Sequence, residues 1–182
     1  MVSKRQFLRH AGFTTIELIM VMAIAAVLIA IVVPSFKSAI QTASTTREIN
    51  AFVGDLGFAR AEAIKEGVPV TICASSDGAK CSGSTSWQSG WIIFSNPTLS
   101  ANPAGTPLRK QVAFTSTDKL VSDNNTSAIS FSSEGFTVSL PGNPVTFALQ
   151  TSPVTTSLTQ CVAINIAGRH VMQKAATGNC PS

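Results

Sequence analysis

A run of sixteen consecutive apolar residues, Leu18–Val33, constrains the fold of this chain more than any other feature. The 21 residues from Phe13 to Val33, at a helical rise of about 1.5 Å each, form a helix about 31 Å long, close to the thickness of a bilayer's hydrocarbon core. The run therefore predicts a membrane span. Glu17 does not suit a simple anchor, because a carboxylate in hydrocarbon costs about 2.5 to 3.5 kcal/mol. We expect Glu17 either to have a partner or to lie close enough to the interface to reach water.

The residues around this carboxylate form a short motif, Gly12-Phe13-Thr14-Thr15-Ile16-Glu17-Leu18. It resembles the type III signal of type IV pilins and type II secretion pseudopilins, whose usual form has leucine in place of Thr15. The resemblance implies that a prepilin peptidase cuts between Gly12 and Phe13 and methylates the new amino terminus at Phe13. A Glu17 carboxylate one turn from that amine would neutralise the amine of a neighbouring subunit and set the register of packed helices. Pro34 lies where pilins commonly carry a helix-loosening proline.

An ordinary secretory signal peptide is the alternative interpretation of this segment. Its apolar centre has roughly 7 to 15 residues and is followed by a cleavage site with small residues. The run here is longer, carries Glu17, and continues past Pro34 into helix-compatible sequence. These differences favour the pilin-type signal.

The length and charge of the chain limit the remaining possibilities. The chain has 182 residues, and removal of residues 1–12 leaves room for a membrane helix and one globular domain. The formal net charge of +4 suggests a nucleic-acid ligand, but Lys4, Arg5 and Arg9 all lie in the leader, so the mature chain has ten basic and nine acidic residues. The basic leader instead predicts a cytoplasmic N-terminus and an outward C-terminal domain, and the pilin resemblance implies a single-pass protein with this domain in the periplasm.

After the apolar run, residues 35–66 have an amphipathic helical pattern, with apolar residues at spacings of three and four. Gly67 followed by Pro69 is a stop signal. We expect Gly54 and Gly57 to mark close packing. The predicted packing face is Ile49, Phe52, Val53, Leu56, Ala59 and Ala63, and the predicted wet face includes Arg47, Asp55, Arg60, Glu62, Lys65 and Glu66.

From residue 68 onward, short β-branched runs alternate with turn residues and predict antiparallel strands. The predicted fold class is α+β and pilin-like, a long N-terminal spine helix packed on an antiparallel β domain. Its parts are a cleaved leader (1–12), a transmembrane and polymerisation helix (13–34), an amphipathic helix (35–67) and the β domain (68–182). Strands are expected at Val68–Cys73, Trp91–Phe94, Leu108–Phe114, Ala128–Phe131, Phe136–Leu140, Val145–Leu149, Cys161–Ile166 and His170–Gln173.

Several segments of this region resemble the GspH/FimT branch of the pilin family, which groups minor pilins of type IV pili with the minor pseudopilin of type II secretion. They are Phe58–Gly67, Val70–Cys73, Asp77-Gly78 with Cys81, and Gly90–Phe94. The resemblance implies a bacterial inner-membrane protein that moves into a pilus or pseudopilus. The implied partners are other major and minor pilins or pseudopilins, the prepilin peptidase, the inner-membrane assembly platform and, before assembly, membrane lipid.

Four cysteines, Cys73, Cys81, Cys161 and Cys180, follow the membrane segment. An even number in an oxidising compartment favours disulfides, and the sequence permits three pairings. The local pairs, Cys73 with Cys81 and Cys161 with Cys180, are preferred because each closes one loop between neighbouring strands. The spacing is not that of a zinc site.

No catalytic residue, metal or cofactor is expected. The mature chain has one histidine, His170, no tyrosine, and no recognisable group of serine, histidine and carboxylate or of paired carboxylates. Isolated side chains of these types do not make an active site, so we expect that the protein is not an enzyme.

The C-terminal hairpin contains the candidate ligand site. Arg169 and His170 follow the turn glycine Gly168, with Lys174 close by, and are expected to project from the turn. The hairpin resembles that of FimT-type minor pilins of natural transformation, in which a Gly-Arg-x-Arg motif is associated with DNA binding. Here Val171 replaces the second arginine, and loss of one cation weakens phosphate binding. A tight turn with a solvated arginine is the simpler interpretation.

Three hypotheses for the function follow. The first is a minor type IV pilin built into the pilus at or near its tip, where it helps to prime assembly, with twitching or DNA uptake downstream. The second is a minor pseudopilin of a type II secretion system. The third is a DNA-binding minor pilin of natural transformation, which would bind through Arg169.

Overall fold

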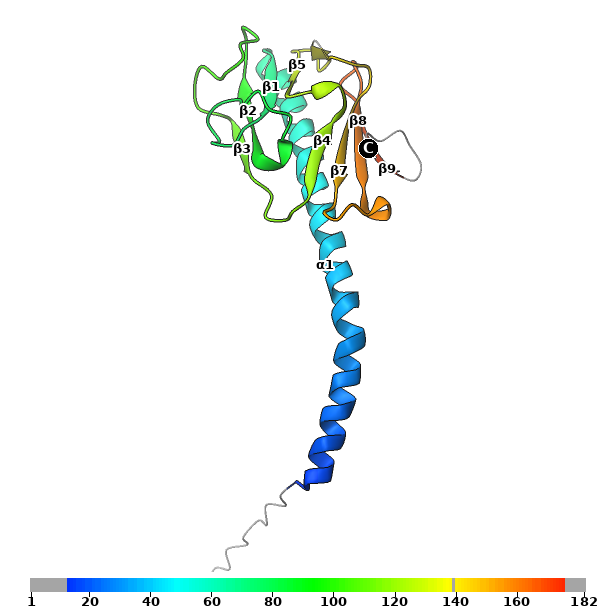
Figure 1. Cartoon of the computed structure of the whole chain (residues 1–182). Helices are drawn as coiled ribbons and strands as arrows, with labels where there is room; N and C mark the ends of the chain where they lie inside the picture. Colours follow the sequence, from blue (N-terminus) through cyan, green and yellow to red (C-terminus); the bar gives the residue numbers. More distant parts are fainter. Residues whose placement is uncertain (1–12, 139, 176–182) are drawn as a thin grey trace, which may run out of the picture. The chain divides into compact units, whose positions relative to one another are not determined.

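The computed structural model describes residues 13–138 and 140–175 and contains one long α-helix followed by β-strands and short 3-10 helices (Figure 1). The chain divides into two compact units, residues 1–41 and 42–182, and α1 continues from the first into the second. The elements are α1 (Thr15–Glu66), β1 (Val70–Ala74), η1 (Trp87–Ser89), β2 (Gly90–Ser95), β3 (Arg109–Val112), β4 (Lys119–Ser122), η2 (Asp123–Asn125), β5 (Ala128–Phe131), β6 (Thr137–Val138), β7 (Val145–Gln150), η3 (Thr156–Leu158), β8 (Gln160–Ile164) and β9 (His170–Lys174).

The second half of α1 is amphipathic, as its periodicity predicts, and its apolar face forms one side of the domain core. The helix ends at Glu66, because Gly67 adopts a positive φ of 69° and its N–H closes the last turn on the Ala63 carbonyl at 3.0 Å. The fully buried residues of this face are Ile49, Phe52, Leu56, Ala59 and Ala63.

The prediction that Asp55 lies on the wet face of the helix is wrong. Its carboxylate is buried and accepts hydrogen bonds from Trp91 Nε1 and from Arg109 Nη1, each at 2.8 Å. The Arg109 guanidinium also lies 3.9 Å from the centre of the Phe58 ring. Both carboxylate oxygens are thus satisfied inside the domain, and the group joins α1 to β2 and β3.

The two glycines of α1 differ in their surroundings. Among the described residues, a Cβ built on Gly54 meets nothing within 4 Å, and one on Gly57 meets only the His170 ring at an ordinary 3.8 Å. The prediction is wrong for Gly54, which faces open space.

The described strands form two antiparallel sheets, of order β3-β2-β1-β5-β6 and β4-β7-β8-β9. This architecture confirms the α+β prediction, with one long helix packed on antiparallel sheets. In the first sheet β1 is central, and Ile72 is paired with Ile93 on one side and Ile129 on the other. Figure 1 shows the two sheets next to each other, with the second half of α1 against them. The predicted strands are all present, although β6 is shorter than expected, and β4 was not predicted.

An aromatic cluster joins the helix to both sheets. The Phe52 ring of α1 lies 5.4 Å from Trp87, 5.3 Å from Trp91 and 4.9 Å from Phe147, measured between ring centres. Trp91 comes from β2 in the first sheet, Phe147 from β7 in the second, and Trp87 from η1. The indole N–H of Trp87 donates to the Thr126 carbonyl at 2.7 Å, so this polar atom is also satisfied.

Candidate functional site

Thr14 caps the start of α1. The Glu17 N–H donates to Thr14 Oγ1 at 3.3 Å, and the Leu18 N–H donates to the Thr14 carbonyl at 3.2 Å. Glu17 therefore lies in the first turn, where a carboxylate is favoured by the helix dipole. Phe13 precedes this turn and is exposed. Gly12, the other side of the predicted cleavage bond, lies outside the described residues.

The first half of α1 has apolar side chains on all sides. The large ones from Leu18 to Val33 are between 45% and 67% exposed in the isolated chain. A helix that is apolar all round needs lipid or other helices around it, and this helix is long and apolar enough to cross a membrane. It continues through Pro34 without an interruption.

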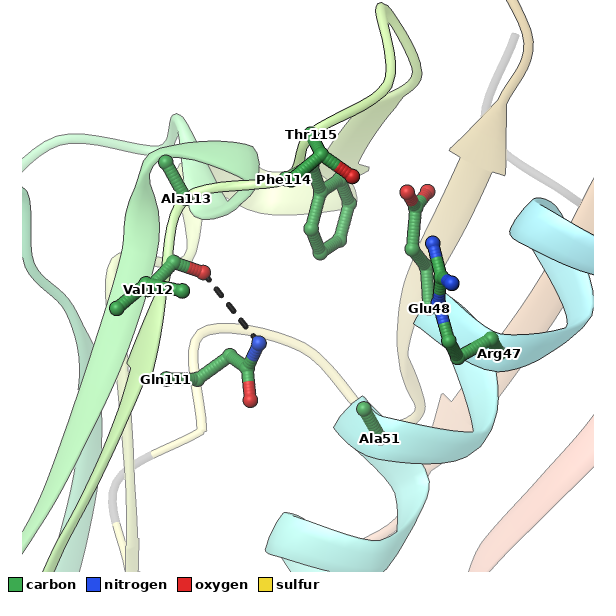
Figure 2. A pocket seen from close by; sticks show the side chains of 8 residues that line it. All are labelled: Arg47, Glu48, Ala51, Gln111, Val112, Ala113, Phe114 and Thr115. Atoms are coloured by element: carbon green, nitrogen blue, oxygen red, sulfur yellow. Dashed lines mark hydrogen bonds between the residues drawn. The ribbon is translucent and has the colours of Figure 1, made fainter.

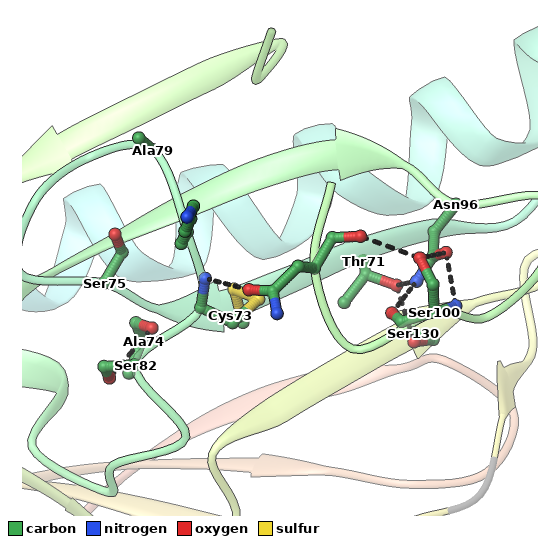
Figure 3. Close-up of a disulfide and its surroundings, with 12 residues drawn as sticks. Thr71, Cys73, Ala74, Ser75, Ala79, Ser82, Asn96, Ser100 and Ser130 are labelled. Atoms are coloured by element: carbon green, nitrogen blue, oxygen red, sulfur yellow. Dashed lines mark hydrogen bonds between the residues drawn. A yellow bond between two sulfur atoms is a disulfide. The ribbon is translucent and has the colours of Figure 1, made fainter. Parts of the chain in front are cut away.

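The disulfide between Cys73 and Cys81 joins the end of β1 to the following loop (Figure 3). Cys73 is buried, and the Cys81 N–H donates to Asn102 Oδ1 at 3.1 Å, so the bridge also holds the long loop after β2. Cys161 is a disulfide cysteine. Its predicted partner, Cys180, lies outside the described residues.

The turn of the C-terminal hairpin packs against a second turn, between β5 and β6. Gly168 has a positive φ of 70°, and a Cβ built there would lie 2.1 Å from the Gly135 carbonyl oxygen. Only glycine fits this approach of two backbones. The glycine of the predicted motif thus has a structural role.

Arg60 of α1 bridges the same two turns. Its Nε donates to the Gly135 carbonyl at 2.9 Å and its Nη2 to the Ala167 carbonyl at 3.1 Å. The helical pattern places Arg60 on the predicted wet face of the helix. It does not indicate this role, because the role depends on turns more than seventy residues away.

His170 does not project from the turn as expected. It lies half-buried, with its ring over Gly57 of α1, and its Nδ1 is buried without a hydrogen-bond partner among the described residues. Burial in the first place, and the charge of Arg60 in the second, lower the pKa of His170. The side chain is therefore neutral near pH 7 and adds no charge to a DNA site.

Arg169 is the exposed cation of the hairpin. Its N–H donates to Asn165 Oδ1 at 3.1 Å, which closes the turn, while the side chain faces solvent. Lys174 ends β9, five residues further along the strand. Of the three predicted DNA-binding residues, the structure therefore shows Arg169 exposed and His170 turned toward the helix.

The described residues contain no group of three or more His, Cys, Asp or Glu side chains placed to hold a metal ion. The features with functional content are instead the apolar half-helix with its acidic first turn and the exposed face of the β domain.

This combination of an apolar N-terminal half-helix and an amphipathic half packed on antiparallel sheets defines the class of minor pilins and pseudopilins. A family model described as Type II transport protein GspH matches residues 48–168. The chain therefore belongs to the GspH/FimT-like family of minor pilins, and its role is that of a minor pilin or pseudopilin.

Solved structures agree with this assignment. Two crystal structures of the type IV minor pilin FimU of Pseudomonas aeruginosa are similar to this chain, each at 25% sequence identity. Their TM-scores are 0.59 and 0.55, and the matches cover 78% and 74% of this chain and 95% and 94% of FimU. A search of curated proteins gave no match.

Proposed function

We propose that this protein is a minor pilin of a type IV pilus, built into the filament at or near the tip, where it supports the start of assembly. The observation that carries the proposal is the half-helix from Leu18 to Val33, whose large apolar side chains are all exposed in the isolated chain. Such a surface suits lipid first and the packed helices of a filament afterwards. The similarity to FimU over nearly all of that protein supports the pilus rather than another machine.

The N-terminal chemistry follows from the same helix. In the proposal, the prepilin peptidase cuts between Gly12 and Phe13 in the inner membrane, and the assembly platform lifts the mature subunit into the filament. Phe13 then supplies a terminal amine just before the first turn of α1. The carboxylate of Glu17, in that turn, forms an ion pair with the terminal amine of a neighbouring subunit. The pair replaces two separate charges in an apolar medium, which would each be costly.

Two substitutions separate the charge of Glu17 from the rest of its side chain. The cap bond uses the backbone N–H of residue 17, so it survives both substitutions. Glu17→Gln keeps the size of the side chain and removes its charge, whereas Glu17→Ala removes both. The proposal predicts that both variants enter the membrane and that both are absent from sheared pili. Normal incorporation of Glu17→Gln would mean that the charge of this residue is not needed.

A minor pseudopilin of a type II secretion system is the alternative, supported by the description of the matching family model. Deletion of the chain separates the two. The pilus proposal predicts loss or reduction of surface pili and of twitching with normal protein secretion. A secretion defect with normal pili would favour the pseudopilin.

DNA binding for uptake is the third possibility, and the exposed Arg169 is the observation that favours it. If the protein binds DNA in this way, the purified full chain in detergent should retard DNA in a gel at low salt and retard it less at higher salt. The Arg169→Ala variant should not retard DNA at all. His170 is turned inward and Val171 occupies the second arginine position, so neither adds a cation to Arg169 here. No retardation at low salt would remove this function.

A further inference from the structure

Glu48 of α1 is a carboxylate that the assembly role of the membrane helix does not use. Its side chain is only 5% exposed. One oxygen, Oε1, accepts hydrogen bonds from Ser44 Oγ at 3.2 Å and Ser116 Oγ at 2.7 Å. The other, Oε2, is buried and has no hydrogen-bond partner in the described part of the chain. A buried carboxylate oxygen without a partner is costly, so its presence calls for an explanation.

The carboxylate lines an open pocket of about 390 Å³ between α1 and the segment after β3 (Figure 2). Figure 2 shows Glu48 rising from the helix toward the segment that carries Phe114. The opposite wall is largely apolar, since Phe114 is half-buried and Val112 is 70% exposed. The pocket thus joins a largely apolar wall to the side chain of Glu48.

The charges around the pocket favour a cationic occupant. Asp118, which accepts a hydrogen bond from Thr45 Oγ1 at 3.2 Å, is also buried. Burial first, and then repulsion by Asp118, raise the pKa of Glu48, against the opposing effects of Ser116, Ser44 and Arg47. Arg47 is exposed and also lines the pocket, and its Nη2 donates to Ser44 Oγ at 3.5 Å. The carboxylates of Glu48 and Asp118 thus outnumber this cation, and a second cation beside Glu48 would offset the cost of the buried charge.

A divalent metal does not fit this site. Calcium takes about six to eight oxygen ligands, and no group of three acidic, His or Cys side chains is placed for a metal within residues 13–138 and 140–175. A lysine or arginine side chain does fit, because its alkyl stem packs on apolar surface while its head keeps a charge partner. Members of this family assemble with other pilins, so the occupant considered is a side chain of a neighbouring subunit.

We propose that the Glu48 pocket is a subunit interface that receives a lysine or arginine side chain of a neighbouring pilin. The stem would lie along Val112 and Phe114, and the cationic head would pair with the Glu48 carboxylate. This inference rests on the proposed function, since it needs the chain to be inside a filament.

The test uses the full chain in its own cells, with a photo-crosslinking amino acid in place of Val112 at the pocket, or in place of Leu28 in the apolar half-helix. Glu48→Gln keeps the shape of the side chain without its charge, and Glu48→Met is a second neutral variant of similar size. Glu134→Gln is the matched control, because Glu134 is an exposed carboxylate on the turn between β5 and β6. Thermal unfolding of each variant reports folding independently.

The inference predicts crosslinks from both positions to pilin subunits, with the Val112 adduct on a peptide that contains lysine or arginine. Glu48→Gln and Glu48→Met should lower the Val112 crosslink by about tenfold or more, because a buried interfacial charge pair is lost. Their unfolding temperatures should stay equal or rise, since each removes a buried charge, and Glu134→Gln should change neither reading.

Two results would overturn the inference alone. One is an unchanged Val112 crosslink in both Glu48 variants, and the other is a pilin crosslink from Leu28 but none from Val112. If neither position crosslinks to a pilin, the proposed function fails and this inference fails with it.

Discussion

Replacement of Gly168 by alanine tests how the C-terminal hairpin is held. The new Cβ would lie 2.1 Å from the Gly135 carbonyl oxygen, whereas a carbon and an oxygen approach no closer than about 3.3 Å in favourable contacts. The two turns must therefore separate. Separation breaks the hydrogen bonds that Arg60 donates to both turns, at about 1.5 kcal/mol each for a charged donor that is partly exposed.

The positive φ of 70° at Gly168 adds a further cost of about 1 to 2 kcal/mol for alanine. The total loss is about 4 kcal/mol. Gly67→Ala is the matched control, because Gly67 has nearly the same φ of 69° but no atom of the described part of the chain within 4 Å of a built Cβ. It should lose only about 1 to 2 kcal/mol.

Urea unfolding of the full chain in detergent micelles, followed by the fluorescence of the buried Trp87 and Trp91, measures both losses. The structure predicts a difference of about 3 kcal/mol between Gly168→Ala and Gly67→Ala. Equal losses would refute the contact between the two turns and, with it, the structural role assigned to the motif glycine.

Three further predictions concern the β domain. Phe52→Ala should lower the free energy of unfolding by about 3 to 5 kcal/mol in the same assay, because Phe52 joins the helix to both sheets; a loss below about 1 kcal/mol would contradict that role. Replacement of both Cys73 and Cys81 by alanine should cost about 2 to 3 kcal/mol through the entropy of the unfolded chain, and an unchanged midpoint would show otherwise. Because the pKa of His170 is lowered, the folded state binds its proton less well than the unfolded chain. The domain should keep its stability above pH 6.5 and lose some as pH falls through the folded pKa, and His170→Gln should remove that part of the loss.

The sequence predicts the helix well because its signals are local. The run from Leu18 to Val33, the apolar periodicity around Phe52 and the stop at Gly67 all act within a few residues. Most strands were found for the same reason, as apolar runs between turn residues. Lys119–Ser122 was missed because β4 has only one fully buried apolar residue, Leu120, among polar neighbours.

The remaining features depend on contacts between distant segments, which a single sequence does not contain. Asp55 has the spacing of a wet-face residue, yet Trp91 and Arg109 make it a buried acceptor. The division of the strands into two sheets and the inward turn of His170 are tertiary outcomes of the same kind. Glu48 likewise looks like an ordinary charged residue of an amphipathic helix until its surroundings are known.

The proposal that α1 is a processed polymerisation helix specifies the N-terminus of the mature protein. Mass spectrometry of the protein extracted from its own membranes would identify the first residue and any modification. An N-methylated Phe13, produced by cleavage after Gly12, is the expected result. A mature protein that begins at Met1, or at a residue after Val33, would contradict the proposal.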